Sequence, residues 1–224
     1  KNFFRFGQYC EVLGKIILNP KNKTPLTILV DGKWGAGKTS LLKMMKKWID
    51  DMSTEIRRQA QDESSKDKNK LLLRPAKTVW FNAWQYSSEP SMLAALLKTI
   101  FAEMGKNSSM QDKVSVQVDG KELFKQFIDK LSGGIVGHSS SWINEFRIEE
   151  QLPFFDQFSG IFQKFVQTYA MGNDPKRSDQ NGIFVIFVDD LDRCPPDKLP
   201  RLFEAIKLFL GFEGWNFVLG MDNA

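Results

Sequence analysis

The chain has 224 residues, of which 42% are hydrophobic and 26% are charged. This length suffices for one α/β domain with a sizeable core, or for one domain that carries an insertion. The composition excludes a wholly disordered, collagen-like or disulfide-scaffold chain. The longest uninterrupted apolar run, residues 183–188, is far too short to span a membrane. Because the sequence begins at Lys1 and shows no signal-peptide pattern, we expect a processed or excerpted piece of a longer protein.

The net charge of +4 is distributed unevenly along the chain. Residues 1–77 carry a net charge of +9, whereas residues 78–224 carry −5. A basic half can attract phosphates, nucleic acid or an anionic membrane face, and it can equally be a solvated helix face with phosphate-binding lysines. The two cysteines, Cys10 and Cys194, lie far apart and have no partners at metal-ligand spacing, which favours a reducing, cytosolic compartment.

Helical and strand-like patterns alternate in the first half of the chain. Apolar residues at a helical period predict amphipathic helices, and short apolar runs predict buried strands. The elements expected in chain order are a helix over 3–18, a strand over 26–30, a helix whose apolar stripe reaches Met52, a polar loop over 60–70, a strand over 78–81 and a helix over 90–101.

The second half begins with a polar, glycine- and serine-rich segment, residues 105–150, which predicts an inserted subdomain of helical and irregular structure. The elements expected after it are a helix over 154–169, a loop over 172–182, a strand over 183–188, a helix over 199–210 and a strand over 215–221. The strand over 183–188 is apolar throughout, as is typical of a central parallel strand. Strands that alternate with helices predict a three-layer α/β/α domain with a mostly parallel sheet.

A complete G-x-x-x-x-G-K-[ST] motif lies between a predicted strand and a predicted helix: Gly32-Lys33-Trp34-Gly35-Ala36-Gly37-Lys38-Thr39. Its glycines let the backbone curl so that consecutive N–H groups face a phosphate at the helix N-terminus. Lys38 would reach the β- and γ-phosphates, and the Thr39 hydroxyl would bind Mg²⁺. We therefore expect this segment and the following Ser40 to bind a nucleotide. The alternative is a plain glycine turn.

Two acids, Asp189 and Asp190, directly follow the apolar strand. Asp189 occupies the position of the acid that holds Mg²⁺ in P-loop enzymes. Asp190 stands where many hydrolytic P-loop enzymes carry a glutamate that polarises the attacking water, although an aspartate is one methylene shorter. The alternative is that Asp190 and Asp192 cap the following helix.

Polar residues also end two other predicted strands, at the sheet edge where parallel sheets bind ligands. Asn82 ends the strand over 78–81 and could sense the γ-phosphate or hold the catalytic acid. Asp222 ends the last strand and could sense the same phosphate. A polar residue that closes a strand is, however, often only a turn former.

Arg193 lies just beyond the acids and could act as an arginine finger, or it could form an ion pair with Asp192 or Glu204. Three tryptophans flank these motifs, and we expect all of them to pack, although the first could also flank the nucleotide: Trp34, Trp80 and Trp84.

Four blocks together resemble the KAP family of P-loop NTPases. In chain order they are the motif over 32–39, W-F-N-A-W-Q-Y over 80–86, V-D-D-L-D-R-C over 188–194 and V-L-G-M-D over 218–222. The first block is generic, whereas the second and third together are much more specific. The resemblance extends over about residues 26–222.

The resemblance implies an ATPase domain of the additional-strand P-loop division, with Asp190 as its second Walker B acid and with ATP and Mg²⁺ bound. Family members are typically large multidomain proteins, many of them held at the cytoplasmic face of a membrane by inserted helices, and bacterial relatives include phage-exclusion proteins. Here the insertion over 105–150 is polar, so we expect no membrane span in this chain. The sequence also stops soon after Asp222, so we expect a domain truncated at its C-terminus.

We therefore expect residues 1–224 to form an ATP-binding and ATP-hydrolysing switch domain of a larger bacterial protein, with antiphage defence as one role that the resemblance implies. The expected location is the cytoplasm or the inner face of a membrane, and the expected partners are ATP and either a second copy or other domains of the same protein. Two alternatives stay open: a nucleotide-binding scaffold without turnover, and a nucleic-acid-responsive module.

Overall fold

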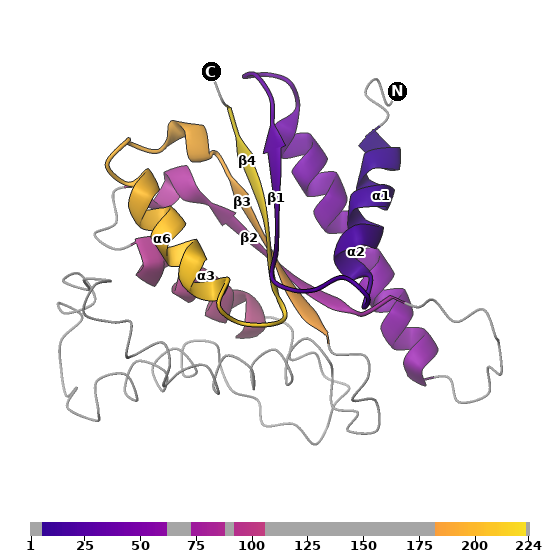
Figure 1. Ribbon diagram of the computed structural model, residues 1–224. Helices are drawn as coiled ribbons and strands as arrows, with labels where there is room; N and C mark the ends of the chain where they lie inside the picture. The colour runs from indigo at the N-terminus through magenta and orange to yellow at the C-terminus, as the bar shows by residue number, and fades with distance from the viewer. Residues whose placement is uncertain (1–5, 62–72, 88–91, 106–181, 223–224) are drawn as a thin grey trace, which may run out of the picture.

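The computed structural model describes residues 6–61, 73–87, 92–105 and 182–222 (Figure 1). Its helices and strands, in chain order, are α1 (Phe6–Leu18), β1 (Leu26–Asp31), α2 (Lys38–Gln61), β2 (Ala76–Asn82), the 3₁₀ helix η1 (Ala83–Tyr86), α3 (Met92–Gly105), β3 (Ile183–Asp189), the 3₁₀ helix η5 (Leu191–Arg193), α6 (Leu199–Phe209) and β4 (Trp215–Met221). The insertion expected over 105–150 lies outside the described residues except for Gly105, and so does the helix expected over 154–169.

The four strands form one parallel sheet in the order β1-β4-β3-β2. β4 therefore lies between β1, which precedes the glycine-rich loop, and β3, which ends at Asp189. This position makes β4 the additional strand that the resemblance implies. Because the strands are parallel, their carboxyl ends all meet at one edge of the sheet, in the upper part of Figure 1. The residues that follow the strands are thereby brought together.

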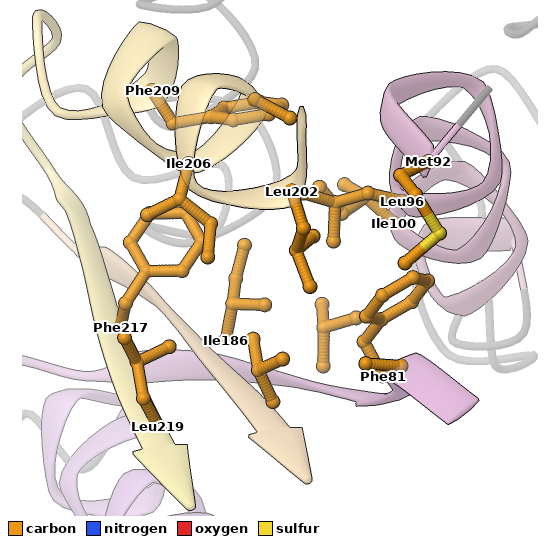
Figure 2. Close-up of a cluster of buried hydrophobic side chains, with 14 of the residues drawn as sticks. Phe81, Met92, Leu96, Ile100, Ile186, Leu202, Ile206, Phe209, Phe217 and Leu219 are labelled. Carbon is orange, nitrogen blue, oxygen red and sulfur yellow. The ribbon is translucent and has the colours of Figure 1, made fainter. Parts of the chain in front are cut away.

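Helices cover both faces of the sheet, which confirms the three-layer α/β/α fold (Figure 1). α1 and α2 pack on one face over a core that includes Leu42, Met45 and Val185. α3 and α6 pack on the other face, where Figure 2 shows Leu96 and Ile206 reaching towards strand residues. Every residue of β3 is buried, as expected for a central strand that is covered on both sides.

A buried amide ties three strands together at the end of the sheet opposite the glycine-rich loop. Asn216, only 1% exposed, accepts a hydrogen bond of 2.9 Å from the backbone N–H of Leu26 on β1. Its Nδ2 donates to the carbonyl oxygen of Phe184 on β3 over 3.4 Å. These bonds satisfy a polar side chain in the core and help to fix β4 between its neighbours.

α2 is longer than the sequence indicates, because it continues to Gln61 and includes the first two residues of the loop expected over 60–70. Its last turns are held by the burial of Ile56, 7% exposed, and by an ion pair of 2.8 Å between Arg58 and Glu55. The buried hydroxyl of Ser53 also accepts a hydrogen bond of 2.9 Å from the N–H of Ala76, which joins the helix to the start of β2. The remainder of the expected loop lies outside the described residues.

None of the helices in the described part of the chain is long and apolar enough to cross a membrane. Both cysteines are buried and free of disulfide bonds. Burial raises the pKa of the Cys194 thiol to about 11, with the charges of Asp190 and Asp192 adding to the effect. This thiol is therefore protonated and unreactive at neutral pH.

Gly14 is required where α1 crosses α2. A Cβ at this position would lie 2.3 Å from two ring atoms of Trp48, far inside van der Waals contact. The absence of a side chain thus lets the two helices approach each other closely at this point.

We predict that Gly14→Ala lowers the free energy of unfolding by about 1 kcal/mol, although alanine favours a helix by a similar amount. Overpacking typically costs about 1–3 kcal/mol, which exceeds the gain in helix propensity. In a Trp48→Leu background the clash is absent, so the same substitution should stabilise the protein. Urea unfolding of the four variants measures both effects, and stabilisation by Gly14→Ala alone would contradict this account.

Candidate functional site

The glycine-rich loop between β1 and α2 has the backbone geometry of an anion cradle. Gly35 and Gly37 have φ angles of 80° and 89°, in the left-handed region that favours glycine. The N–H of Ala36 donates to the carbonyl of Lys33 over 3.0 Å and closes a tight turn, at whose tip Trp34 is 78% exposed. α2 has no acidic residue in its first turn, so the positive end of its dipole is not neutralised there.

Lys38, the first residue of α2, folds back over this loop. Its Nζ donates to the carbonyl oxygen of Gly32 over 2.5 Å and lies 3.4 Å from that of Lys33. The same Nζ lies 3.9 Å from Oδ2 of Asp222, which follows the end of β4. The structure therefore brings the loop lysine and Asp222 together as an ion pair, with the lysine contacting backbone oxygens.

Thr39 and Asp189 meet where the start of α2 faces the end of β3. Asp189 is 2% exposed, and this burial raises the pKa of its carboxyl group. The hydrogen bond to the side chain of Thr39 lowers the same pKa, whereas the charge of Asp190 raises it. The burial of Asp189 means that its ionised form needs a positive charge close by.

The oxygens of Thr39 and Asp189 fit a Mg²⁺ ion. Both are hard oxygen ligands, and the desolvated carboxylate of Asp189 is a group that a divalent cation would stabilise. No cluster of three or more His, Cys, Asp or Glu side chains in the described part of the chain could hold a metal by itself. Mg²⁺ in nucleotide sites is commonly held by one or two protein oxygens together with phosphates and waters, which this pair can provide.

Asp190 is held by two partners at the end of β3. Asn82, the last residue of β2, donates from Nδ2 to Oδ2 of Asp190 over 2.7 Å. Arg193 Nε lies 3.1 Å from Oδ1 of the same carboxylate. The Asp190 backbone has a φ of 57°, in the left-handed region, which aspartate tolerates better than most residues. Asn82 is fixed in turn, because its Oδ1 accepts from the N–H of Gln85 over 3.3 Å.

These contacts exclude two of the alternatives that the sequence left open and correct one expectation. Asp190 precedes η5 but makes no capping hydrogen bond with its side chain. Arg193 pairs with Asp190 instead of Asp192 or Glu204. Trp80 packs as expected, stacked on Phe187 at 6.2 Å between ring centroids, but two other tryptophans lie at the surface: Trp34 at 78% and Trp84 at 52% exposed.

Two close approaches that shape the site were not predicted from the sequence. A Cβ on Gly220 of β4 would lie 2.5 Å from Cδ1 of Leu42 and 3.3 Å from Oδ1 of Asp189, so the glycine leaves room for α2 beside the acid. A lone glycine within a strand is a known sign of such close approach. A Cβ on Gly37 would lie 3.2 Å from the ring of Phe6 on α1. No pattern in the sequence predicts that this ring lies so close to the loop.

We predict that Asp189→Asn raises the melting temperature of the nucleotide-free protein at pH 7–8. Because burial raises the carboxyl pKa above its unfolded value, ionisation favours the unfolded chain as the pH rises, and the substitution removes this penalty. The gain should shrink as the pH is lowered below the raised carboxyl pKa and vanish below about 3, where the acid is protonated in both states. Asp31→Asn, which removes an exposed carboxylate at the same sheet edge, is the control; equal gains in both variants would contradict the prediction.

A model described as the KAP family P-loop domain matches residues 6–224. No curated protein matches the chain. P-loop NTPase domains generally bind a nucleotide with Mg²⁺, which suits the loop, the lysine and the buried acid found here. The match over nearly the whole chain, together with the glycine-rich loop and the additional strand β4, shows that the chain belongs to the KAP family of P-loop domains.

Proposed function

We propose that the chain binds ATP with Mg²⁺ and hydrolyses it, as a switch domain of a larger protein. The observation that carries the proposal is that four kinds of group meet at one sheet edge. They are a phosphate-binding loop with its lysine, a hydroxyl–carboxylate pair for Mg²⁺, a second acid oriented by an amide, and an arginine beside that acid. This set supplies the positioning and the charge neutralisation that phosphoryl transfer needs.

The loop would bind the triphosphate through its backbone N–H groups and through Lys38. In the structure the Lys38 ammonium group contacts the carbonyl oxygens of Gly32 and Lys33. It would exchange these contacts for the β- and γ-phosphates, while the start of α2 provides a positive dipole end. Thr39 and Asp189 would hold Mg²⁺, which when bound neutralises charge on the β- and γ-phosphate oxygens.

Asp190 would accept a proton from the attacking water. Its Oδ2 is fixed by the amide of Asn82, which is itself anchored to the backbone of Gln85, so the carboxylate has a defined direction. Asn82 is thus a positioning residue in this proposal. Arg193 is 48% exposed in its side chain, and its guanidinium would be free to move from Asp190 towards the charge that develops on the γ-phosphate.

The choice of ATP over other nucleoside triphosphates, like a role in antiphage defence and contacts with a second copy or other domains, rests on the family resemblance alone. The nucleic-acid alternative draws little support from α2, the helix that carries much of the basic half. Lys46 pairs with Asp50 at 2.7 Å and Lys47 with Asp51 at 2.9 Å, which reduces the positive potential along this face.

We predict that Asp190→Asn reduces ATP turnover by about a hundredfold or more while it changes the affinity for Mg-ATP by less than about threefold. The substitution preserves the size of the side chain but removes the base, and general bases contribute about 10²–10⁴-fold. Phosphate release and a nucleotide-binding titration on the same preparations separate the two quantities. Asp192→Asn, two positions further on and exposed, is the matched control and should keep normal turnover.

Three outcomes would count against parts of the proposal. Unchanged turnover in Asp190→Asn would remove this acid from the mechanism. An equal loss of turnover and affinity would indicate that Asp190 supports nucleotide binding and not the chemical step. Tight binding without turnover in the unaltered chain would favour the scaffold alternative.

A further inference from the structure

The carboxylate of Asp222 lies close to the ammonium group of Lys38, the phosphate-binding lysine. Its Oδ2 lies 3.9 Å from Nζ of Lys38, and the two side chains are only 14% and 12% exposed. An ion pair of such limited exposure is screened less by solvent and salt than a surface pair. Among the ion pairs that the described residues form, Asp222 is the one carboxylate paired with this lysine.

A bound triphosphate would need the same cation. Lys38 Nζ already contacts the carbonyl oxygens of Gly32 and Lys33, and these neutral oxygens cannot balance a buried ammonium charge as a carboxylate does. Asp222 therefore stabilises the arrangement of Lys38 seen in the structure. When a phosphate replaces the carbonyl contacts, the fixed negative charge of Asp222 lies close to the incoming negative charge and repels it.

We propose that Asp222 acts as an internal competitor of the nucleotide phosphates for Lys38, and thereby weakens the binding of polyphosphates to this site. This inference rests on the proposed function, since it needs a nucleotide at the loop. It assigns Asp222 a specific role in setting affinity: the residue favours release of the nucleotide. The effect depends on the number of phosphates that reach Lys38, so it is absent for a monophosphate.

The sequence-based expectation for Asp222, a sensor that contacts the γ-phosphate, predicts the opposite sign. A contacting residue strengthens the binding of ATP, so its loss weakens binding. A competitor weakens the binding of ATP, so its loss tightens binding. The two roles are therefore separated by the direction of one affinity change.

The test is Asp222→Asn in the whole chain, which keeps the shape of the side chain and removes its charge. We expect Mg-ATP and Mg-ADP to bind about tenfold more tightly, while the affinity for AMP stays unchanged. Asp31→Asn is the matched control, because Asp31 ends the neighbouring strand β1, is exposed and pairs in register with Met221. It removes one negative charge from the same sheet edge and should leave all three affinities unchanged.

Thermal unfolding of the nucleotide-free proteins accompanies the titrations. Asp222→Asn leaves Lys38 without its counter-ion, so its melting temperature should not rise, and tighter nucleotide binding cannot then be a by-product of a more stable fold. Weaker or unchanged binding of Mg-ATP to Asp222→Asn would overturn the inference, and so would equal tightening by Asp31→Asn. If neither the unaltered chain nor Asp222→Asn binds Mg-ATP, the proposed function is wrong and the inference fails with it.

Discussion

The site depends on the parallel arrangement of the four strands, because a parallel sheet delivers the last residue of every strand to the same edge. β1 leads there into the phosphate-binding loop, β2 ends in Asn82, β3 in Asp189 and β4 just before Asp222. Lys38 and Asp222, which are 184 positions apart in the chain, thus become neighbours. An antiparallel strand at any of these places would carry its polar residue to the opposite edge.

Bringing several carboxylates to one edge costs electrostatic free energy, because like charges repel. The structure offsets this cost by pairing carboxylates with cations. Three of the carboxylates at this edge belong to the proposed site. The two that are less buried each face a cation, as Lys38 faces Asp222 and Arg193 faces Asp190. The third, Asp189, is the most buried, and it has the hydroxyl of Thr39 but no cation in direct contact among the described ion pairs. A Mg²⁺ ion would stabilise this buried carboxylate, so the burial that raises its pKa also suits the site to bind a metal–nucleotide complex.

Much of the fold could be predicted from the sequence, because its signals are local. A run of six apolar residues predicts the central strand β3, and the glycine-rich motif predicts both the loop and the helix that follows it. The partners of the site residues could not be predicted, because they depend on strand order. Asn82 and Asp190 bond only because β2 lies beside β3, and Lys38 reaches Asp222 only because β4 lies beside β1. The short helices η1 and η5 likewise lack any periodic pattern and follow from these contacts.

The central claim is that this sheet edge hydrolyses a nucleotide through the phosphate-binding loop. The most direct measurement is phosphate release from Mg-ATP by the chain, compared with Lys38→Ala and with Lys47→Ala, an exposed lysine two turns further along α2. The account predicts Mg²⁺-dependent release that Lys38→Ala abolishes and Lys47→Ala preserves. Release that persists in Lys38→Ala, or no release with or without Mg²⁺ from the unaltered chain, would contradict it.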